Sequence, residues 1–141
     1  MQASWREIPH TADLGIEVTA PDRAALFETA ARGMIACIGD LSPAAGAAAE
    51  TVRVLLAAAD EAALLRDWLA EVLFRVDQRR MTLAAVNFAA LDAGRLDAEI
   101  TLVPYDPARS VLRREVKAVT YHQLSVTRTA SGFTARVLFD I

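Results

Sequence analysis

The sequence predicts a single α+β domain, spanning residues 1–141, in which two helices pack on a mixed or antiparallel β-sheet. The length of 141 residues fits one domain with a sizeable core. Two stretches, 22–39 and 60–80, carry apolar residues at helical spacing, whereas most other apolar stretches alternate with a period of two. The predicted order is two strands, a helix, a strand, a helix and five further strands, without an internal repeat or linker.

The N-terminal part begins with a short predicted strand at 5–7. Pro9 lacks an amide donor and restricts the backbone, so residues 9–12 are expected to form a turn or an irregular strand entrance. The alternation of residues 14–18 then predicts a half-buried strand. Asp22 is the expected N-cap of the first helix, and Gly39 is its expected C-terminal stop.

The second helix follows a predicted loop at 41–49 and a predicted strand at 50–58. Asp60 is its expected N-cap. Its apolar residues form one stripe, made of Leu65, Trp68, Leu69, Val72, Leu73 and Val76. We expect Phe27 and Trp68 to pack against a sheet, and the side chains of Glu61 and Arg66 to be exposed.

The remainder of the chain is expected to be β-structure. A hairpin connects 82–90 to 95–103 through a short turn at 92–94. Residues 104–114 interrupt the alternation with two prolines. Three more strands are expected after this interruption, at 115–121, 124–129 and 133–140.

The composition is typical of a globular protein of the cytoplasm. Apolar residues make up 54% of the chain and charged residues 23%, which excludes a disordered chain. We find neither a signal pattern nor an apolar run long enough to span a membrane, and expect no membrane partner. One cysteine excludes an internal disulfide framework. The net charge of −3 excludes a nucleic-acid-binding surface over the whole protein and leaves direct RNA contact open.

Three acidic groups occupy positions where strands begin or end. Asp13 precedes the strand at 14–18, and Asp140 ends the last strand, with the carboxylate of Ile141 beside it. Clustered carboxylates supply the oxygen ligands that hard divalent cations require. Spacing alone favours a simpler alternative, in which Asp13 caps its turn and Asp140 is solvated, because the sequence does not show that the two ends meet.

Four blocks of the sequence are similar to blocks of the archease family and follow the family's order. They are His10-Thr11-Ala12-Asp13, residues 69–77, residues 116–122 (VKAVTYH) and residues 136–141 (RVLFDI). Together they span nearly the whole chain, which therefore resembles an archease. The resemblance implies an archease-like domain over residues 1–141.

The resemblance also implies a function that composition and spacing do not show. Archeases are cytosolic proteins that activate an RtcB-type RNA ligase in tRNA splicing and RNA repair, promoting its guanylylation and multiple turnover. The alternative family role is that of a chaperone or specificity modulator of a tRNA methyltransferase. The family positions that match Asp13, Asp140 and Ile141 bind a metal, usually calcium, with magnesium and manganese as alternatives. Gln123 departs from the family, which has Gly or another small residue there.

Lys117 is the only lysine in a chain with fourteen arginines. On composition alone, chance explains a single lysine at least as well as a functional need for one. A functional need would be for the compact ammonium charge of lysine, which the planar guanidinium of arginine does not supply. The family's basic residue falls at Lys117, so the resemblance implies that it contacts the partner or the acidic cluster. His10 is expected to orient Asp13 or to cap its turn. His10 and His122 are too few for a zinc site, and we expect His122 to be a hydrogen-bonded strand histidine.

The residues leave two alternatives to an activator. Asp13 and Asp140 would serve as the acid–base pair of a small metal-dependent hydrolase, and a metal-stabilised structural module would need no partner. We expect no catalytic residue, because the chain lacks a phosphate-binding glycine loop and Cys37 is expected to be buried. A small basic patch, made of Arg109, Arg113 and Arg114, is either a solvated loop or a contact for RNA or an acidic partner.

Overall fold

A five-stranded sheet carries the first and last strands of the chain. The computed structural model describes residues 2–9 and 13–141. The strand order is β1-β2-β10-β8, with β9 also paired to β10, and every pairing within the described residues of this sheet is antiparallel. The strands are β1 (Ser4–Pro9), β2 (Leu14–Ala20), β8 (Ala118–Val119), β9 (Ser125–Thr129) and β10 (Gly132–Asp140).

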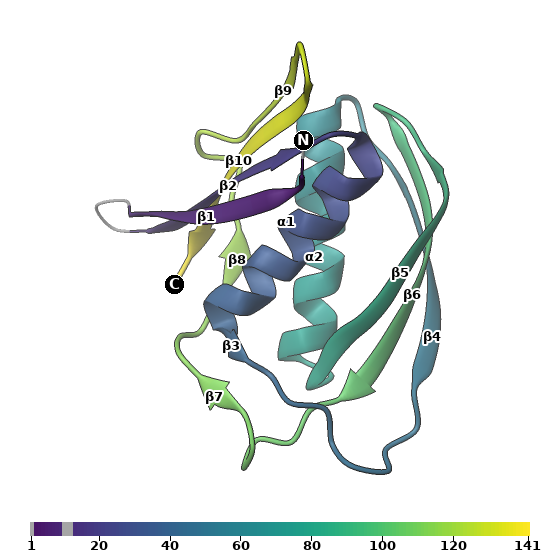
Figure 1. Cartoon of the computed structure of the whole chain (residues 1–141), viewed down its shortest axis with the longest axis vertical. Coiled ribbons are helices and arrows are strands. Elements are labelled where there is room, and N and C mark those ends of the chain that lie inside the picture. The colour runs from purple at the N-terminus through teal and green to yellow at the C-terminus, as the bar shows by residue number, and fades with distance from the viewer. Residues whose placement is uncertain (1, 10–12) are drawn as a thin grey trace.

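Two helices lie between this sheet and a second one (Figure 1). Helix α1 (Arg23–Ile38) contacts β2 and α2, and helix α2 (Glu61–Asp77) contacts β5, β4 and β8. The second sheet has the antiparallel order β4-β6-β5, made of β4 (Glu50–Ala57), β5 (Met81–Leu91) and β6 (Arg95–Pro104). The predicted α+β class with two helices is confirmed, although the helices are enclosed by two sheets and do not cover a single one.

The core is centred on Trp68, which is fully buried. Its indole Nε1 donates a hydrogen bond to the carbonyl oxygen of Phe27 at 2.9 Å, and its ring lies 5.5 Å from that of Phe88 in β5. Phe27 is also fully buried. Both helices therefore bury the apolar stripes that the sequence predicted.

The ends of the helices are formed by the residues that the sequence indicated. The side chains of Asp22 and Asp60 accept hydrogen bonds from the amides of Ala25 and Ala63, each at 2.8 Å. Gly39 ends α1, and a β-carbon there would lie 2.3 Å from the carbonyl oxygen of Val111. Only glycine therefore permits the close pairing of β3 (Gly39–Asp40) with β7 (Val111–Leu112).

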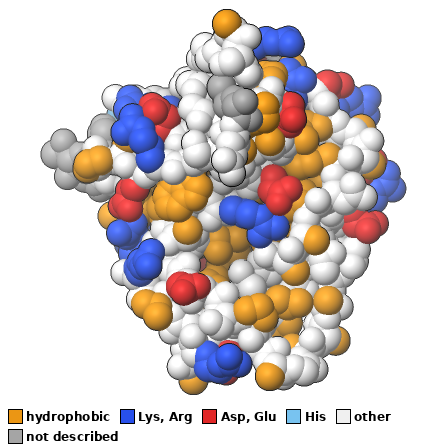
Figure 2. Space-filling view, in the orientation of Figure 1, with side chains coloured by type: hydrophobic (Ala, Val, Ile, Leu, Met, Phe, Trp, Pro, Cys, Tyr) orange, Lys and Arg blue, Asp and Glu red, His pale blue; other side chains and the backbone are white. Residues whose placement is uncertain are grey.

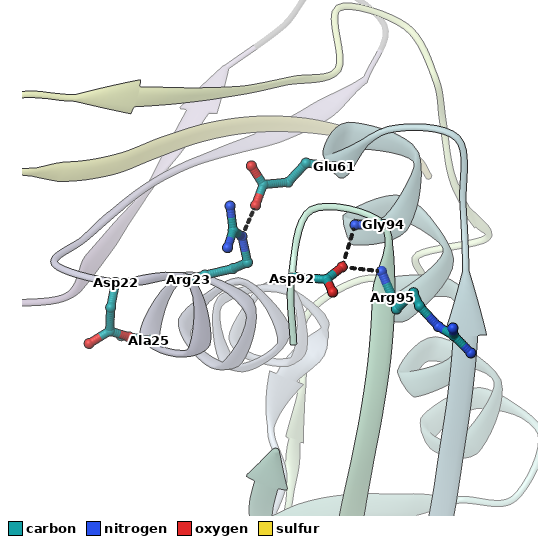
Figure 3. A network of polar contacts seen from close by, with 7 residues as sticks. All are labelled: Asp22, Arg23, Ala25, Glu61, Asp92, Gly94 and Arg95. Carbon is teal, nitrogen blue, oxygen red and sulfur yellow. Dashed lines mark hydrogen bonds and ion pairs between the residues drawn. The ribbon is translucent and has the colours of Figure 1, made fainter. Parts of the chain in front are cut away.

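The expectation that Glu61 and Arg66 are exposed was wrong. Their side chains are only 18% and 28% exposed. Glu61 forms an ion pair with Arg23, which joins the first turns of the two helices (Figure 3). Arg66 donates from Nε to the carbonyl oxygen of Val119 at 3.1 Å. Helical spacing identifies the faces of one helix, whereas these contacts depend on the neighbours that cover it.

The predicted hairpin at 92–94 is confirmed and closed by Asp92 (Figure 3). One carboxylate oxygen of Asp92 accepts hydrogen bonds from the amides of Gly94 and Arg95, both at 2.9 Å. These two bonds to the charged form lower the pKa of Asp92 below its ordinary value. The amides of the turn therefore find their hydrogen-bond acceptor within the turn itself.

The predicted strand at 115–121 is reduced to the two residues of β8. Upstream, the amides of Arg113 and Arg114 donate to the carbonyl oxygen of Ile38, at the end of α1. Downstream, Gln123 has a φ of 51°, which turns the chain away from the sheet. The segment is therefore held upstream by hydrogen bonds to the end of α1 and turned away from the sheet downstream.

Gln123→Gly is expected to raise the free energy of unfolding by about 1 kcal/mol, because a side chain disfavours the left-handed backbone of this position. Urea denaturation measures the change. Gln78→Gly is the matched control: Gln78 has a helical φ of −85°, so glycine there is expected to destabilise the protein. A loss of stability in Gln123→Gly would contradict the interpretation.

The surface carries mixed charges. Figure 2 shows acidic and basic side chains interspersed over one face, in keeping with the net charge of −3. Neither helix described is long and apolar enough to cross a membrane.

Candidate functional site

The three acidic groups indicated by the sequence converge at one end of the five-stranded sheet. The ladder between β2 and β10 ends at the pair Leu14–Phe139, so Asp13 and Asp140 come next in the same register. Adjacent strands lie about 5 Å apart in the pairing direction. Ile141 follows Asp140 where β10 leaves the sheet (Figure 1). The strand order thus brings Asp13, Asp140 and Ile141 together, although Asp13 lies far from the other two in the sequence.

Buried neighbours hold these groups in place. Leu14 and Phe139 are 4% and 0% exposed and belong to the core. Asp140 and Ile141 are exposed, and Asp13 is partly buried. Side chains alternate along a strand. Because Leu14 and Phe139 are anchored in the core, their neighbours Asp13 and Asp140 are turned toward solvent. The arrangement presents negative charge from a rigid support.

Lys117 lies at the same end of the sheet. Its amide donates a hydrogen bond to the carbonyl oxygen of Asp140 at 2.8 Å, immediately before β8 begins. The residue is exposed, and within the described part of the chain its ammonium group forms none of the ion pairs. Its charge is therefore available to the acidic groups or to a partner.

The donors at this end are oxygens, which fit a hard cation. In residues 2–9 and 13–141, no group of three or more His, Cys, Asp or Glu residues is placed so that it could hold a metal ion. The acidic site contributes two such residues, Asp13 and Asp140, beside the carboxylate of Ile141. A zinc-type site is therefore absent from that part of the chain. His10, predicted to support Asp13, lies outside the described residues. His122 was expected in a strand, but it lies in a turn, because the chain leaves the sheet after β8. Its amide donates to the hydroxyl of Thr120 at 3.2 Å.

The basic patch is anchored in the fold. Arg114 forms an ion pair with Glu7 at 3.0 Å, and the Arg109 carbonyl accepts a hydrogen bond from Ser42 at 3.1 Å. Arg113 and Arg114 also line a pocket of about 360 Å³ beside the C-terminal ends of the helices, together with Ile38 and Val76. Of the three arginines, Arg114 is the one whose guanidinium is paired with a carboxylate in the part of the chain that the structure describes.

Comparison with known proteins decides the family. The Archease protein family matches residues 5–141. The chain belongs to the archease family. The matched region includes Asp13, Lys117, Asp140 and Ile141, and with them every described position that the resemblance marked as functional.

Relatives and a solved structure agree with this assignment. Protein archease of Methanosarcina barkeri is 34% identical, over 97% of this chain and 95% of the relative. Protein archease of Methanopyrus kandleri is 33% identical, over 97% and 99%. The solution structure of Methanobacterium thermoautotrophicum protein 1598 superposes with a TM-score of 0.72 at 28% identity, covering 97% of this chain and 98% of that one. Family and fold therefore agree over nearly the full length of this archease.

The single thiol is unsuited to nucleophilic chemistry. Cys37 is 2% exposed, and burial raises its pKa to about 11, so the thiolate is scarce at neutral pH. The expectation of a buried Cys37 is confirmed. At the sheet end, the chemistry that the described residues offer is the binding of a cation by oxygen and of an anion by Lys117.

Two exposed aromatic residues, one on α2 and one after β8, were not predicted from the sequence. Phe74 and Tyr121 are 47% and 63% exposed. Phe74 lies outside the buried stripe and is four residues from Ala70 and from Gln78. The signal was an aromatic residue on an otherwise polar helix face.

Proposed function

We propose that this archease is a metal-binding accessory protein that activates an RtcB-type RNA ligase in tRNA splicing and RNA repair, promoting its guanylylation and turnover in the cytoplasm. The observation that carries the proposal is the convergence of Asp13, Asp140 and Ile141 at one sheet end in a chain of the archease family. The proposed role is that of a cofactor and not of an enzyme; the buried thiol of Cys37, with its pKa raised to about 11, is a poor nucleophile.

The carboxylates of Asp13, Asp140 and Ile141 would hold a divalent cation, calcium in the first place, with magnesium and manganese as alternatives. Three negative groups held close repel one another unless a cation offsets them. Calcium accepts six to eight oxygen ligands, so water or backbone carbonyls would complete the shell. His10 would orient Asp13. The bound cation would present positive charge at the end of the sheet, beside Lys117.

A guanylylation assay of the RtcB-type ligase, with and without the full-length protein, tests the function. We expect faster guanylylation and more turnovers when the protein is present, and loss of the effect after chelation. The same protein alone should not hydrolyse a phosphoester, which a small hydrolase would do. A large change in stability on chelation without any effect on the ligase would support a structural module and contradict the proposal.

Lys117→Ala is expected to preserve the fold and to weaken activation of the ligase. Lys117→Arg should recover only part of it, because a planar guanidinium does not replace a compact ammonium charge. Circular dichroism checks the fold, and the guanylylation rate checks activation. Arg95→Ala, a change of another exposed cation in β6 of the other sheet, is the control. If Lys117→Ala activates the ligase as well as the parent does, the Lys117 side chain has no role in activation.

A further inference from the structure

The outer side of α2 carries a saddle centred on Ala70. Arg66, Ala70, Phe74 and Gln78 are spaced four residues apart and form one row along the helix. Two shallow pockets, of about 260 and 370 Å³, lie against this row, and both are lined by Arg66, Ala70 and Phe74. Because the methyl group of Ala70 is the smallest side chain in the row, the surface is lowest between Arg66 and Phe74.

Arg66, on one side of the saddle, is held by three contacts within the protein. Arg66 donates to the Val119 carbonyl at 3.1 Å, contacts the carboxylate of Asp67 at 3.2 Å and places its guanidinium 4.8 Å from the ring centre of Tyr121. Phe74 and Tyr121 are about half exposed. Aromatic residues and arginine are enriched in the cores of protein interfaces, and side chains that are already ordered lose little entropy on binding.

The two sides of the saddle differ in charge. One pocket is lined by Lys117, Ala118 and Val119, next to the acidic site, and also by Asp77, whose carboxylate accepts a hydrogen bond from the Gln78 side chain at 2.8 Å. The other is lined by Asp67 and Glu71. The carboxylates on that side would repel the phosphates of a nucleic acid. A protein segment that carries a carboxylate on one side and a cation on the other is complementary to both.

We propose that a segment of the RtcB-type ligase docks across α2, with an apolar side chain over Ala70 between Arg66 and Phe74 and a carboxylate toward Lys117. This inference rests on the proposed function and names the surface that performs it. Lys117 joins the two regions, because it lines the saddle and lies beside Asp140 at the end of the sheet. A ligase segment bound here would be held next to the acidic site.

The test separates docking from activation by titrating the ligase with the protein and measuring guanylylation. Ala70→Trp fills the saddle, and Phe74→Asp removes one wall and adds a charge. Each is expected to raise the half-maximal concentration about tenfold or more, the effect of losing one interface anchor, with the rate at saturation unchanged. Leu55→Asp is the matched control, since Leu55 is 61% exposed on β4 and lines neither pocket. It should stay within about twofold of the parent, because surface changes away from such features are small.

Circular dichroism and thermal melting first show which variants fold, and Phe74→Ala replaces any that does not. Equal half-maximal concentrations for the parent and both saddle variants would overturn the docking surface and leave the proposed function standing. Failure of the parent to activate the ligase would overturn both. Two other results would overturn the choice of occupant: weaker binding of a single-stranded RNA probe by Phe74→Asp with unchanged ligase activation, or a parent dimer that Ala70→Trp dissociates.

Discussion

Asp140→Asn is expected to lower the affinity for calcium by at least about tenfold and to abolish most of the ligase activation, while leaving the fold unchanged. The substitution keeps the shape of the side chain and removes one of the three negative charges that would hold the cation. Asp140 is exposed, and the strand that positions it is anchored by the buried Phe139. Calorimetric titration with calcium and with magnesium measures affinity, and the guanylylation rate at saturation measures activation.

Asp13→Asn is expected to behave in the same way. Asp13 lies just before Leu14, the β2 residue in the last pair of the β2–β10 ladder, and so lies opposite Asp140. A short C-terminal tag should do similar harm by removing the terminal carboxylate of Ile141, whereas an N-terminal tag should be tolerated. Glu99→Gln is the control, since Glu99 is exposed in β6 of the other sheet. Equal calcium binding and equal activation in the parent, Asp13→Asn and the C-terminally tagged protein would mean that these groups are ordinary surface charges.

Trp68→Ala is expected to reduce the free energy of unfolding by about 3–5 kcal/mol, the range for removing a large aromatic side chain from a core. Trp68 is 0% exposed and packs on Phe88, and its indole satisfies the carbonyl oxygen of Phe27. Native domains are stable by only about 5–15 kcal/mol, so the variant would retain a small margin or unfold. Urea denaturation, followed by far-UV circular dichroism, measures the loss.

Trp68→Phe separates the two contributions of the indole. It keeps an aromatic ring but removes the Nε1 donor, and is expected to cost about 1–3 kcal/mol through the loss of one buried hydrogen bond and some side-chain volume. Leu55→Ala is the control for loss of apolar volume at the surface and should change stability by less than about 0.5 kcal/mol. If Trp68→Ala were as stable as Leu55→Ala, the packing described for the core would be wrong.

The helices were predictable because their signals are local. Each begins at an aspartate whose side chain accepts from an amide three residues on, and each buries one stripe of apolar residues at helical spacing. The hairpin at Asp92 was predictable for the same reason, since its hydrogen bonds lie within the turn. Such interactions depend on residues a few positions apart, which a sequence displays directly.

The strand at 115–121 and the exposure of Glu61 and Arg66 were predicted wrongly because distant contacts decide them. The carbonyl of Ile38 binds the amides of Arg113 and Arg114. Arg23 pairs with Glu61 from the other helix, and Val119 binds Arg66. In each case the deciding partner is dozens of residues away in the sequence, and no local pattern identifies it.

The candidate site divides in the same way. The sequence by itself determined that Asp13 precedes a strand, that Asp140 ends another with Ile141 beside it, and that Lys117 belongs to a segment between them. Only the tertiary structure decided that β2, β10 and β8 are neighbours, which sets Asp13, Asp140 and Lys117 at one end of a sheet. The physical reason is that strand order follows from burying apolar faces against both helices, a property of the assembled core that no single segment carries.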